Sequence, residues 1–272
     1  MKNFFLLCLA ALLVPILAIS QDFGRRSLIN DDWSFHLGDV KYGGREYLDS
    51  GDWEKVDLPH DWSVRHHASP ELASCTGYLP GGIGWYRKEL DLPAAEKGQK
   101  VYIYFEGVYN KSEVFINGKW LGKRPNGYIS FLYELTPYLK WGEKNTLAVR
   151  VDHSESADSR WYTGSGIYRD VYLVYANPLH IDLWGVAYQA EVRENEAVIR
   201  VSTTLDNALD TAPISVVHEL MDHNGERVAV TVSKETAAGH ARTTLTQEMT
   251  LAAPQLWDID SPYLYTLKTL VY

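Results

Sequence analysis

Short segments in which apolar and polar residues alternate, each closed by turn residues, recur through most of this sequence. Residues 147–152 place leucine or valine at every second position, with Arg150 and Asp152 on the opposite face. Successive side chains of a strand point to opposite sides, so this pattern is typical of a strand with one face on a core. Residues 197–205 repeat the alternation, and residues 101–105 are dense in strand-favouring types. The sequence therefore predicts an all-β fold of antiparallel sandwich type.

Two local signals predict how particular segments turn. Asn117-Gly118 follows an alternating segment that contains Val114 and Ile116, which predicts a two-residue β-hairpin. Thr136-Pro137 has the form of a helix N-cap followed by proline, and Gly142 should end that helix after about one turn.

The length of 272 residues leaves room for about two domains. Asn177-Pro178 interrupts the strands, so we place a boundary there, with a first domain over 21–177 and a second over 178–272. The second has the pattern of an immunoglobulin-like sandwich. Its last strand, expected around 263–271, has no closing strand after it, so we expect this sandwich to be truncated at its C-terminal end. A sandwich with fewer strands is the alternative.

The N-terminus has the form of a secretory signal peptide over residues 1–20. Lys2 supplies the charge, residues 4–17 the apolar stretch, and Ala18-Ile19-Ser20 the cleavage site before Gln21. A membrane anchor is the alternative, but Pro15 breaks the stretch, which is shorter than the ~20 residues of a spanning helix. The sequence predicts a secreted or periplasmic protein.

Charge and cysteine content narrow the possible partners. Lysine and arginine total 26 against 35 aspartates and glutamates, a net charge of −9. Such a surface repels phosphate groups, so we expect neither nucleic acid nor membrane as a partner. Cys8 lies in the signal peptide, so Cys75 is left without an intrachain disulfide partner.

The sequence offers no clear catalytic, metal-binding or cofactor-binding residues. Gly164-Ser165-Gly166 lacks the glycine spacing of a nucleophile elbow. His66-His67 has no further ligand at metal-binding spacing. Glu113 and Asp152 lie on polar strand faces, where no apolar pocket would raise a carboxyl pKa.

Several segments together resemble the N-terminal region of glycoside hydrolase family 2. The segments are Leu58-Pro59-His60-Asp61-Trp62, residues 77–88, Val114-Phe115-Ile116-Asn117-Gly118, Gly127-Tyr128 and residues 159–171. The resemblance implies a jelly-roll sugar-binding domain followed by an immunoglobulin-like domain. In this family the catalytic glutamates lie in a following (β/α)₈ barrel, which has no counterpart in these 272 residues.

The resemblance to β-galactosidases of the family implies a parent enzyme that removes terminal β-galactosides by a retaining mechanism. This chain would be its non-catalytic front part and inactive alone, with a β-galactoside-like carbohydrate and the missing barrel as partners. A standalone carbohydrate-binding module and a purely structural sandwich protein are the alternatives.

The resemblance also suggests substrate-binding residues, in a loop that reaches the barrel mouth in those enzymes. They are Asp158, Arg160, Trp161 and Tyr162. Asp158 would accept hydrogen bonds from sugar hydroxyls, and Trp161 or Tyr162 would lie against a sugar ring. A core position for Trp161 is the alternative. We interpret residues 60–62 as structural, and expect core or inter-strand packing for Trp33, Trp53, Trp85 and Trp120.

Overall fold

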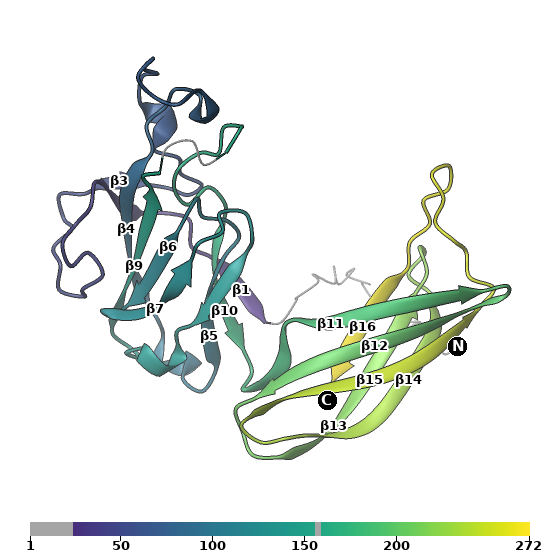
Figure 1. The fold of residues 1–272 in the computed structure, drawn as a ribbon. Helices are drawn as coiled ribbons and strands as arrows, with labels where there is room; N and C mark the ends of the chain where they lie inside the picture. The colour runs from purple at the N-terminus through teal and green to yellow at the C-terminus, as the bar shows by residue number, and fades with distance from the viewer. Residues whose placement is uncertain (1–23, 156–158) are drawn as a thin grey trace, which may run out of the picture.

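The computed structural model describes residues 24–155 and 159–272, which form two β-sandwiches joined end to end along the chain (Figure 1). The predicted signal peptide lies outside the described residues. Within them the only helices are short 3₁₀ turns, and none is long and apolar enough to cross a membrane. The four turns are Ser63–Arg65, Ser74–Thr76, Ala94–Glu96 and Thr136–Tyr138. The all-β prediction is therefore confirmed.

The first sandwich consists of two antiparallel sheets. Their strand orders are β1-β10-β5-β8 and β3-β2-β4-β9-β6-β7. The strands are β1 (Arg25–Leu28), β2 (Trp33–Leu37), β3 (Glu54–Val56), β4 (Gly82–Asp91), β5 (Lys100–Phe105), β6 (Ser112–Ile116), β7 (Lys119–Arg124), β8 (Phe131–Glu134), β9 (Lys144–His153) and β10 (Val171–Ala176). β1 pairs with β10, so Arg25 lies opposite Tyr175.

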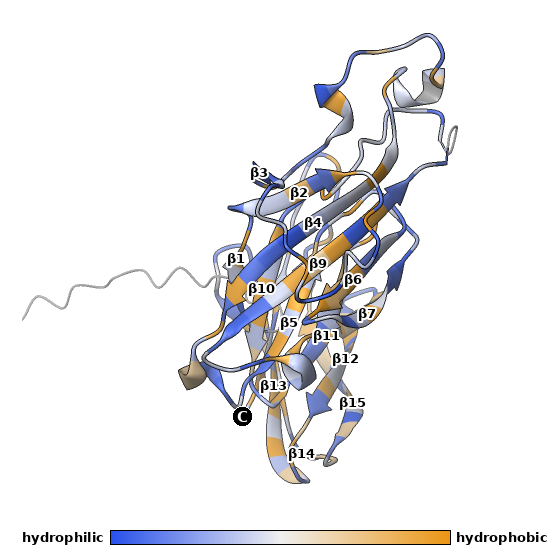
Figure 2. Ribbon diagram, turned by 90° about the vertical axis from the view of Figure 1, so that its left-hand side faces the viewer, coloured by the Kyte–Doolittle hydropathy of each residue, from blue (hydrophilic) through white to orange (hydrophobic). Residues whose placement is uncertain are grey.

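The core of the first sandwich is built from the alternating positions that the sequence indicated. Leu147, Val149 and Val151 are fully buried between the sheets. They belong to the same hydrophobic cluster as Trp33 and Phe105. Orange and blue alternate along the strands in Figure 2, as expected of strands with one face inward. Trp85 is also buried. Trp120 is 58% exposed, so a core position is wrong for it, and only the predicted inter-strand role, opposite Phe115 of β6, is left.

The second sandwich has three strands in each sheet, ordered β11-β12-β15 and β14-β13-β16. The strands are β11 (Leu179–Arg193), β12 (Glu196–Asn207), β13 (Ala212–Met221), β14 (Arg227–Ala237), β15 (Ala241–Ala252) and β16 (Thr266–Val271). Alternate residues of β12, from Ala197 to Leu205, are buried as predicted.

Two predicted boundaries differ from the structure. The last strand begins at Thr266 instead of Tyr263, and the Tyr263 hydroxyl lies 2.9 Å from Nδ1 of His223. Thr136 is not the N-cap of its turn. Leu135 holds that position, while the Thr136 hydroxyl accepts a hydrogen bond from the Val101 amide at 2.8 Å. The hairpin at Asn117-Gly118 is confirmed, with both residues at positive φ (48° and 79°).

Candidate functional site

The predicted substrate-binding residues belong to the loop between β9 and β10. Asp158 lies outside the described residues. Arg160, Trp161 and Tyr162 are all exposed, Trp161 at 60%. The alternative that Trp161 belongs to the core is therefore wrong, and its indole is free to contact a ligand.

Trp161 is joined to a second exposed aromatic residue that sequence reasoning did not select. The indole Nε1 of Trp161 donates a hydrogen bond to the hydroxyl of Tyr128 at 2.9 Å. Tyr128 sits in the turn between β7 and β8, where Asn126 Oδ1 accepts hydrogen bonds from the amides of Tyr128 (2.8 Å) and Ile129 (3.2 Å). We call Trp161 and Tyr128 the aromatic pair. The only sequence signal for Tyr128 was its place in a family-like segment.

Asp61 holds the same loop from the other side. Its carboxylate accepts hydrogen bonds from the Ser63 and Ser165 amides, both at 2.9 Å, and from the Tyr162 hydroxyl. Gly164 passes so close that a Cβ there would lie 3.0 Å from Asp61 Oδ2, and its φ is +74°. Partial burial and then the bond to Asp61 raise the pKa of the Tyr162 hydroxyl. Asp61 therefore fixes the position of Tyr162.

Replacing Asp61 with alanine should release this loop. Two charge-assisted bonds to backbone amides and one to Tyr162 would be lost, each a contribution of about 1.5–3 kcal/mol. We expect trypsin to cleave after the exposed Arg160 at least ~10 times faster in Asp61→Ala, because local opening becomes more frequent.

Asp222→Ala is the matched control for that cleavage. The Asp222 carboxylate also accepts hydrogen bonds from two backbone amides, those of Asn224 (2.9 Å) and Glu226 (2.8 Å), but in the second sandwich. The Asp222→Ala variant should be cleaved after Arg160 at the same rate as the unmodified chain. Equal cleavage rates in Asp61→Ala and the unmodified chain would mean that Asp61 does not hold the loop.

Beneath the loop lies a buried polar network. Nδ1 of His60 is 2.8 Å from the Tyr86 hydroxyl. The Ser63 hydroxyl donates to the Pro80 carbonyl at 2.7 Å, and Ser165 Oγ lies 2.6 Å from Ser63 Oγ and 2.7 Å from Nδ1 of His153. Ser165 is fully buried, so a substrate cannot reach this serine and histidine. The network supports the structural interpretation of residues 60–62.

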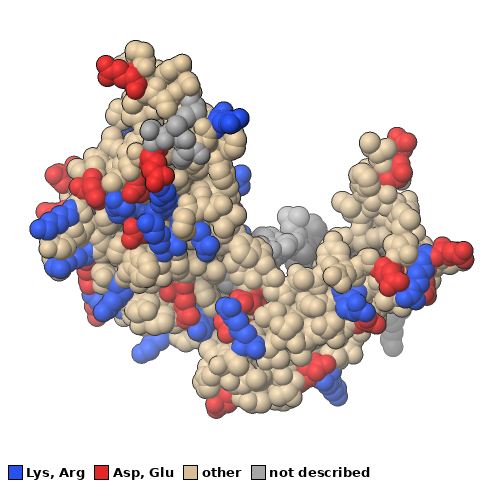
Figure 3. Space-filling view, in the orientation of Figure 1, with Lys and Arg blue, Asp and Glu red and all other residues tan. Residues whose placement is uncertain are grey.

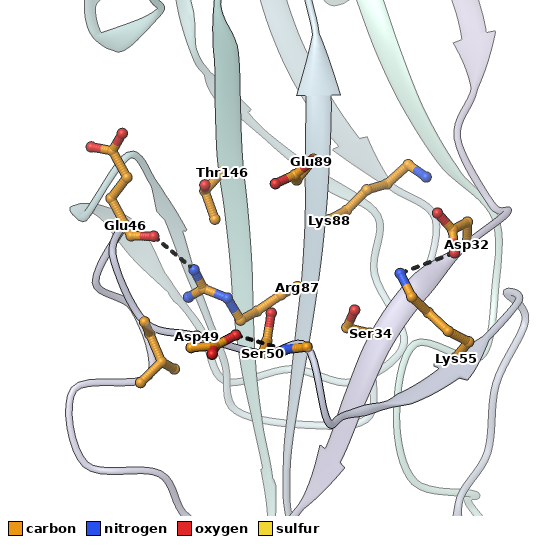
Figure 4. Close-up of a pocket in the computed structure, with 12 residues that line it drawn as sticks. Asp32, Ser34, Glu46, Asp49, Ser50, Lys55, Arg87, Lys88, Glu89 and Thr146 are labelled. Carbon is orange, nitrogen blue, oxygen red and sulfur yellow. Dashed lines mark hydrogen bonds and ion pairs between the residues drawn. The ribbon is translucent and has the colours of Figure 1, made fainter.

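A hollow of about 390 Å³ lies beside β4 (Figure 4). Arg87 points along it and donates hydrogen bonds to the carbonyls of Gly43 (2.8 Å), Arg45 (3.0 Å) and Glu46 (3.1 Å). Burial lowers the pKa of Arg87. Its contacts all hold the loop over β4, so we interpret this residue as structural.

Several charged side chains elsewhere on the first sandwich are paired with opposite charges. Arg150 contacts Asp39 (3.2 Å), Asp152 (3.2 Å) and Glu113 (3.6 Å), the last two being acids considered above for catalysis. On the face shown in Figure 3, basic and acidic side chains of this sandwich lie next to one another. Among residues 24–155 and 159–272, histidine, cysteine, aspartate and glutamate form no group of three that could hold a metal ion.

The arrangement at the aromatic pair suits a sugar better than it suits bond cleavage. Exposed indole and phenol rings offer apolar surfaces to the face of a sugar ring, and nearby polar groups can bind its hydroxyls. The neighbouring carboxylate, Asp61, is already occupied by three donors.

Comparisons with known proteins agree with this geometry. The sequence model described as "Glycosyl hydrolases family 2, sugar binding domain" matches residues 29–178, and "Glycosyl hydrolases family 2" matches residues 179–272. A β-galactosidase of Bacteroides ovatus is 50% identical over 250 residues, which cover 90% of this chain and 29% of that protein. A putative β-glucuronidase of Formosa agariphila is 36% identical over 97% of this chain and 25% of its own length.

A solved structure supports the same relationship. The crystal structure of a β-glycosidase from Bacteroides vulgatus superposes with a TM-score of 0.82 at 40% identity, covering 92% of this chain and 32% of that one. The chain thus spans about a quarter to a third of the length of these relatives. It belongs to glycosyl hydrolase family 2 and corresponds to the N-terminal region of a glycosidase of that family.

Proposed function

We propose that this chain is the N-terminal, non-catalytic part of a β-galactosidase that hydrolyses terminal β-galactosides with retention of configuration. The observation that carries the proposal is the 50% identity with the Bacteroides ovatus β-galactosidase, against 36% with the putative β-glucuronidase. A retaining enzyme needs two carboxyl groups about 5–5.5 Å apart, which the rest of the protein would supply.

The role of this chain in that reaction is to hold the sugar. In our proposal the aromatic pair contacts the ring, and Asp158, Arg160 and Tyr162 bind its hydroxyls. Asp61 acts through Tyr162 as a positioning residue, because it already accepts three hydrogen bonds.

The test is a chimaera in which this chain replaces the matching segment of the Bacteroides ovatus β-galactosidase. We expect the chimaera to hydrolyse an aryl β-galactoside in preference to the matching β-glucuronide. A folded chimaera that is inactive on the galactoside would contradict the proposal. Binding of galactosides by the isolated chain, together with an inactive chimaera, would favour a standalone carbohydrate-binding module.

Trp161→Ala in this chimaera should raise KM for the galactoside about tenfold, since loss of ring stacking costs about 1–1.5 kcal/mol. Trp120→Ala removes an equally exposed indole from β7 and serves as the control, with KM expected to stay within about twofold. Equal KM values for the two variants would remove Trp161 from the sugar site.

We also propose that the chain is exported with cleavage before Gln21. The support is the arrangement of Lys2, the apolar stretch and Ala18-Ile19-Ser20. Mass spectrometry of the protein from its secreting host should find Gln21 at the N-terminus, whereas an intact Met1 would contradict export by this route.

A further inference from the structure

A large bulge interrupts β11 near its start. Ile181 pairs with Leu205 and Val186 with Thr203, so the residues between Ile181 and Val186 face Thr204 alone. Trp184 in this bulge has a φ of +52°, which is unfavourable for a residue with a side chain. Gly185 follows it, where a Cβ would lie 2.7 Å from the carbonyl oxygens of Asp182 and Thr204. Bulges of this kind redirect side chains.

The bulge directs the neighbouring side chains of Leu183 and Trp184 to different surroundings, one packed and one exposed. Leu183 packs against the outer face of the first sandwich, on the cluster that contains Tyr102 and Tyr104. Just before the bulge, Nε2 of His180 lies 3.4 Å from the Tyr102 hydroxyl. These contacts join the two sandwiches. Trp184 remains 66% exposed, so its strained position is not explained by that junction.

Trp184 instead lines a hollow of about 500 Å³, which we call the Trp184 hollow. The other residues that line it come from β7, β8 and the turn between them, and are Arg124, Tyr128, Ile129, Ser130, Phe131 and Leu132. Tyr128 and Ile129 are about half exposed. Large apolar side chains gathered from two sandwiches around one hollow are typical of a surface that another protein part covers.

Arg124 gives the Trp184 hollow its polarity. Its Nε is buried without a hydrogen-bond partner, and its guanidinium carbon lies 5.5 Å from the centre of the Phe131 ring. Among the described residues that line the hollow with Arg124 there is no carboxylate. The hollow therefore offers this guanidinium no counter-charge, so a surface that completes the hollow should bring an acidic group.

Two observations indicate what occupies the hollow. The relatives contain about two thirds or more of their length beyond the region matched here. The hollow is also continuous with the candidate sugar site, because Tyr128 lines it and accepts the hydrogen bond from Trp161. A part of the protein that reaches the sugar at Trp161 therefore lies next to the hollow as well.

We propose that the remaining part of the glycosidase packs on the Trp184 hollow, with Trp184 as an apolar anchor and Arg124 paired with one of its carboxylates. This inference rests on the proposed function. In this proposal the bulge in β11 has a function, because its strained backbone holds the Trp184 indole where the other part of the protein can contact it. A glycan with a carboxylate group could also fit an indole beside an arginine, and the experiment separates the two.

The experiment uses the chimaera described above, with Trp184→Ala and Arg124→Gln made separately and Trp120→Ala as control. We expect each of the two hollow variants to inactivate thermally about tenfold faster than the parent chimaera, the size of effect expected for an interface anchor. Trp184→Ala in the isolated 272-residue chain should leave its unfolding midpoint unchanged, because this side chain is 66% exposed there.

The outcomes distinguish failure of the docking surface from failure of the proposed function. Inactivation rates equal to those of the parent chimaera for both variants would overturn the docking surface while leaving the proposed function intact. Binding of galacturonic acid oligosaccharides by the isolated chain, lost in Trp184→Ala, would overturn it in favour of a glycan site. A chimaera that is inactive but unfolds as one unit, with a lower midpoint in Trp184→Ala, would support the docking surface and contradict the proposed function.

Discussion

Replacing Trp62 with alanine should lower the free energy of unfolding of the first sandwich by about 3–5 kcal/mol. The side chain is fully buried, and its ring stacks on Phe35 with centroids 5.6 Å apart. Its Nε1 donates a hydrogen bond to the Gly81 carbonyl at 3.0 Å. Gly84 lies so close that a Cβ there would be 2.7 Å from the indole, so the neighbouring backbone is shaped around this ring. Alanine would leave a cavity and an unpaired carbonyl.

Urea denaturation followed by tryptophan fluorescence checks this value. Trp120→Ala provides the comparison, because it deletes the same side chain from an exposed site and should change the free energy by less than about 0.5 kcal/mol. Similar losses in the two variants would mean that burial of Trp62 is not what stabilises this region.

Acidification from pH 7 to pH 4 should destabilise the chain by about 3 kcal/mol through His60 alone. Burial, and then the charge of Arg65, lower the pKa of His60 from 6.5 to about 4. The imidazole is 5% exposed, and its Nε2 has no hydrogen-bond partner among the residues that the structure describes. Protonation would therefore place a buried charge without an acceptor.

The sign follows from the two pKa values. In the unfolded chain His60 takes up a proton near pH 6.5, whereas in the folded chain it does so only near pH 4. The stabilisation is complete above pH 6.5 and is lost as the pH falls to about 4. His60→Phe, which keeps an aromatic ring beside Phe35 and Tyr86, should remove this dependence. It should also cost about 1–3 kcal/mol at every pH, because the buried Tyr86 hydroxyl loses its hydrogen bond with His60.

The measurement is the free energy of unfolding at several pH values between 7 and 4 for both proteins. Burial also lowers the pKa values of His180 and His218. Both residues are present in the unmodified chain and in His60→Phe, so their contributions cancel when the two free energies of unfolding are subtracted. His66→Gln, at an exposed site, should retain the full pH dependence. An unchanged slope in His60→Phe would show that His60 is not the titrating group.

The fold could be predicted from the sequence because strand patterning is a local property. The alternation in residues 147–152 and 197–205 predicts which face of each strand is buried, and Asn117-Gly118 predicts a hairpin. Neither prediction requires information on residues that are distant in sequence. The start of β16 could not be located in this way, since it is set by pairing with β13, where Thr266 lies opposite Met221, which is distant in sequence.

The candidate site was only partly predictable for the same reason. Trp161 and Tyr162 came from the resemblance to family 2, but the pairing of Trp161 with Tyr128 exists only after two distant loops meet. The bulge at Trp184 was also missed, because Leu183, Trp184 and Gly185 lie in a segment that looks like an ordinary strand. Gly185 was its only local signal, as an isolated glycine in a strand suggests a bulge.

The pairing of β1 with β10 has an evolutionary consequence. Because Arg25 lies opposite Tyr175, the first sandwich begins and ends at neighbouring points on one sheet edge. A unit whose two ends lie together can be inserted into a surface loop of another protein, or be permuted by joining its ends and opening a loop elsewhere, without unthreading its core. This sandwich therefore has the geometry of a unit that can be transferred whole, together with its β9–β10 loop, from one protein to another.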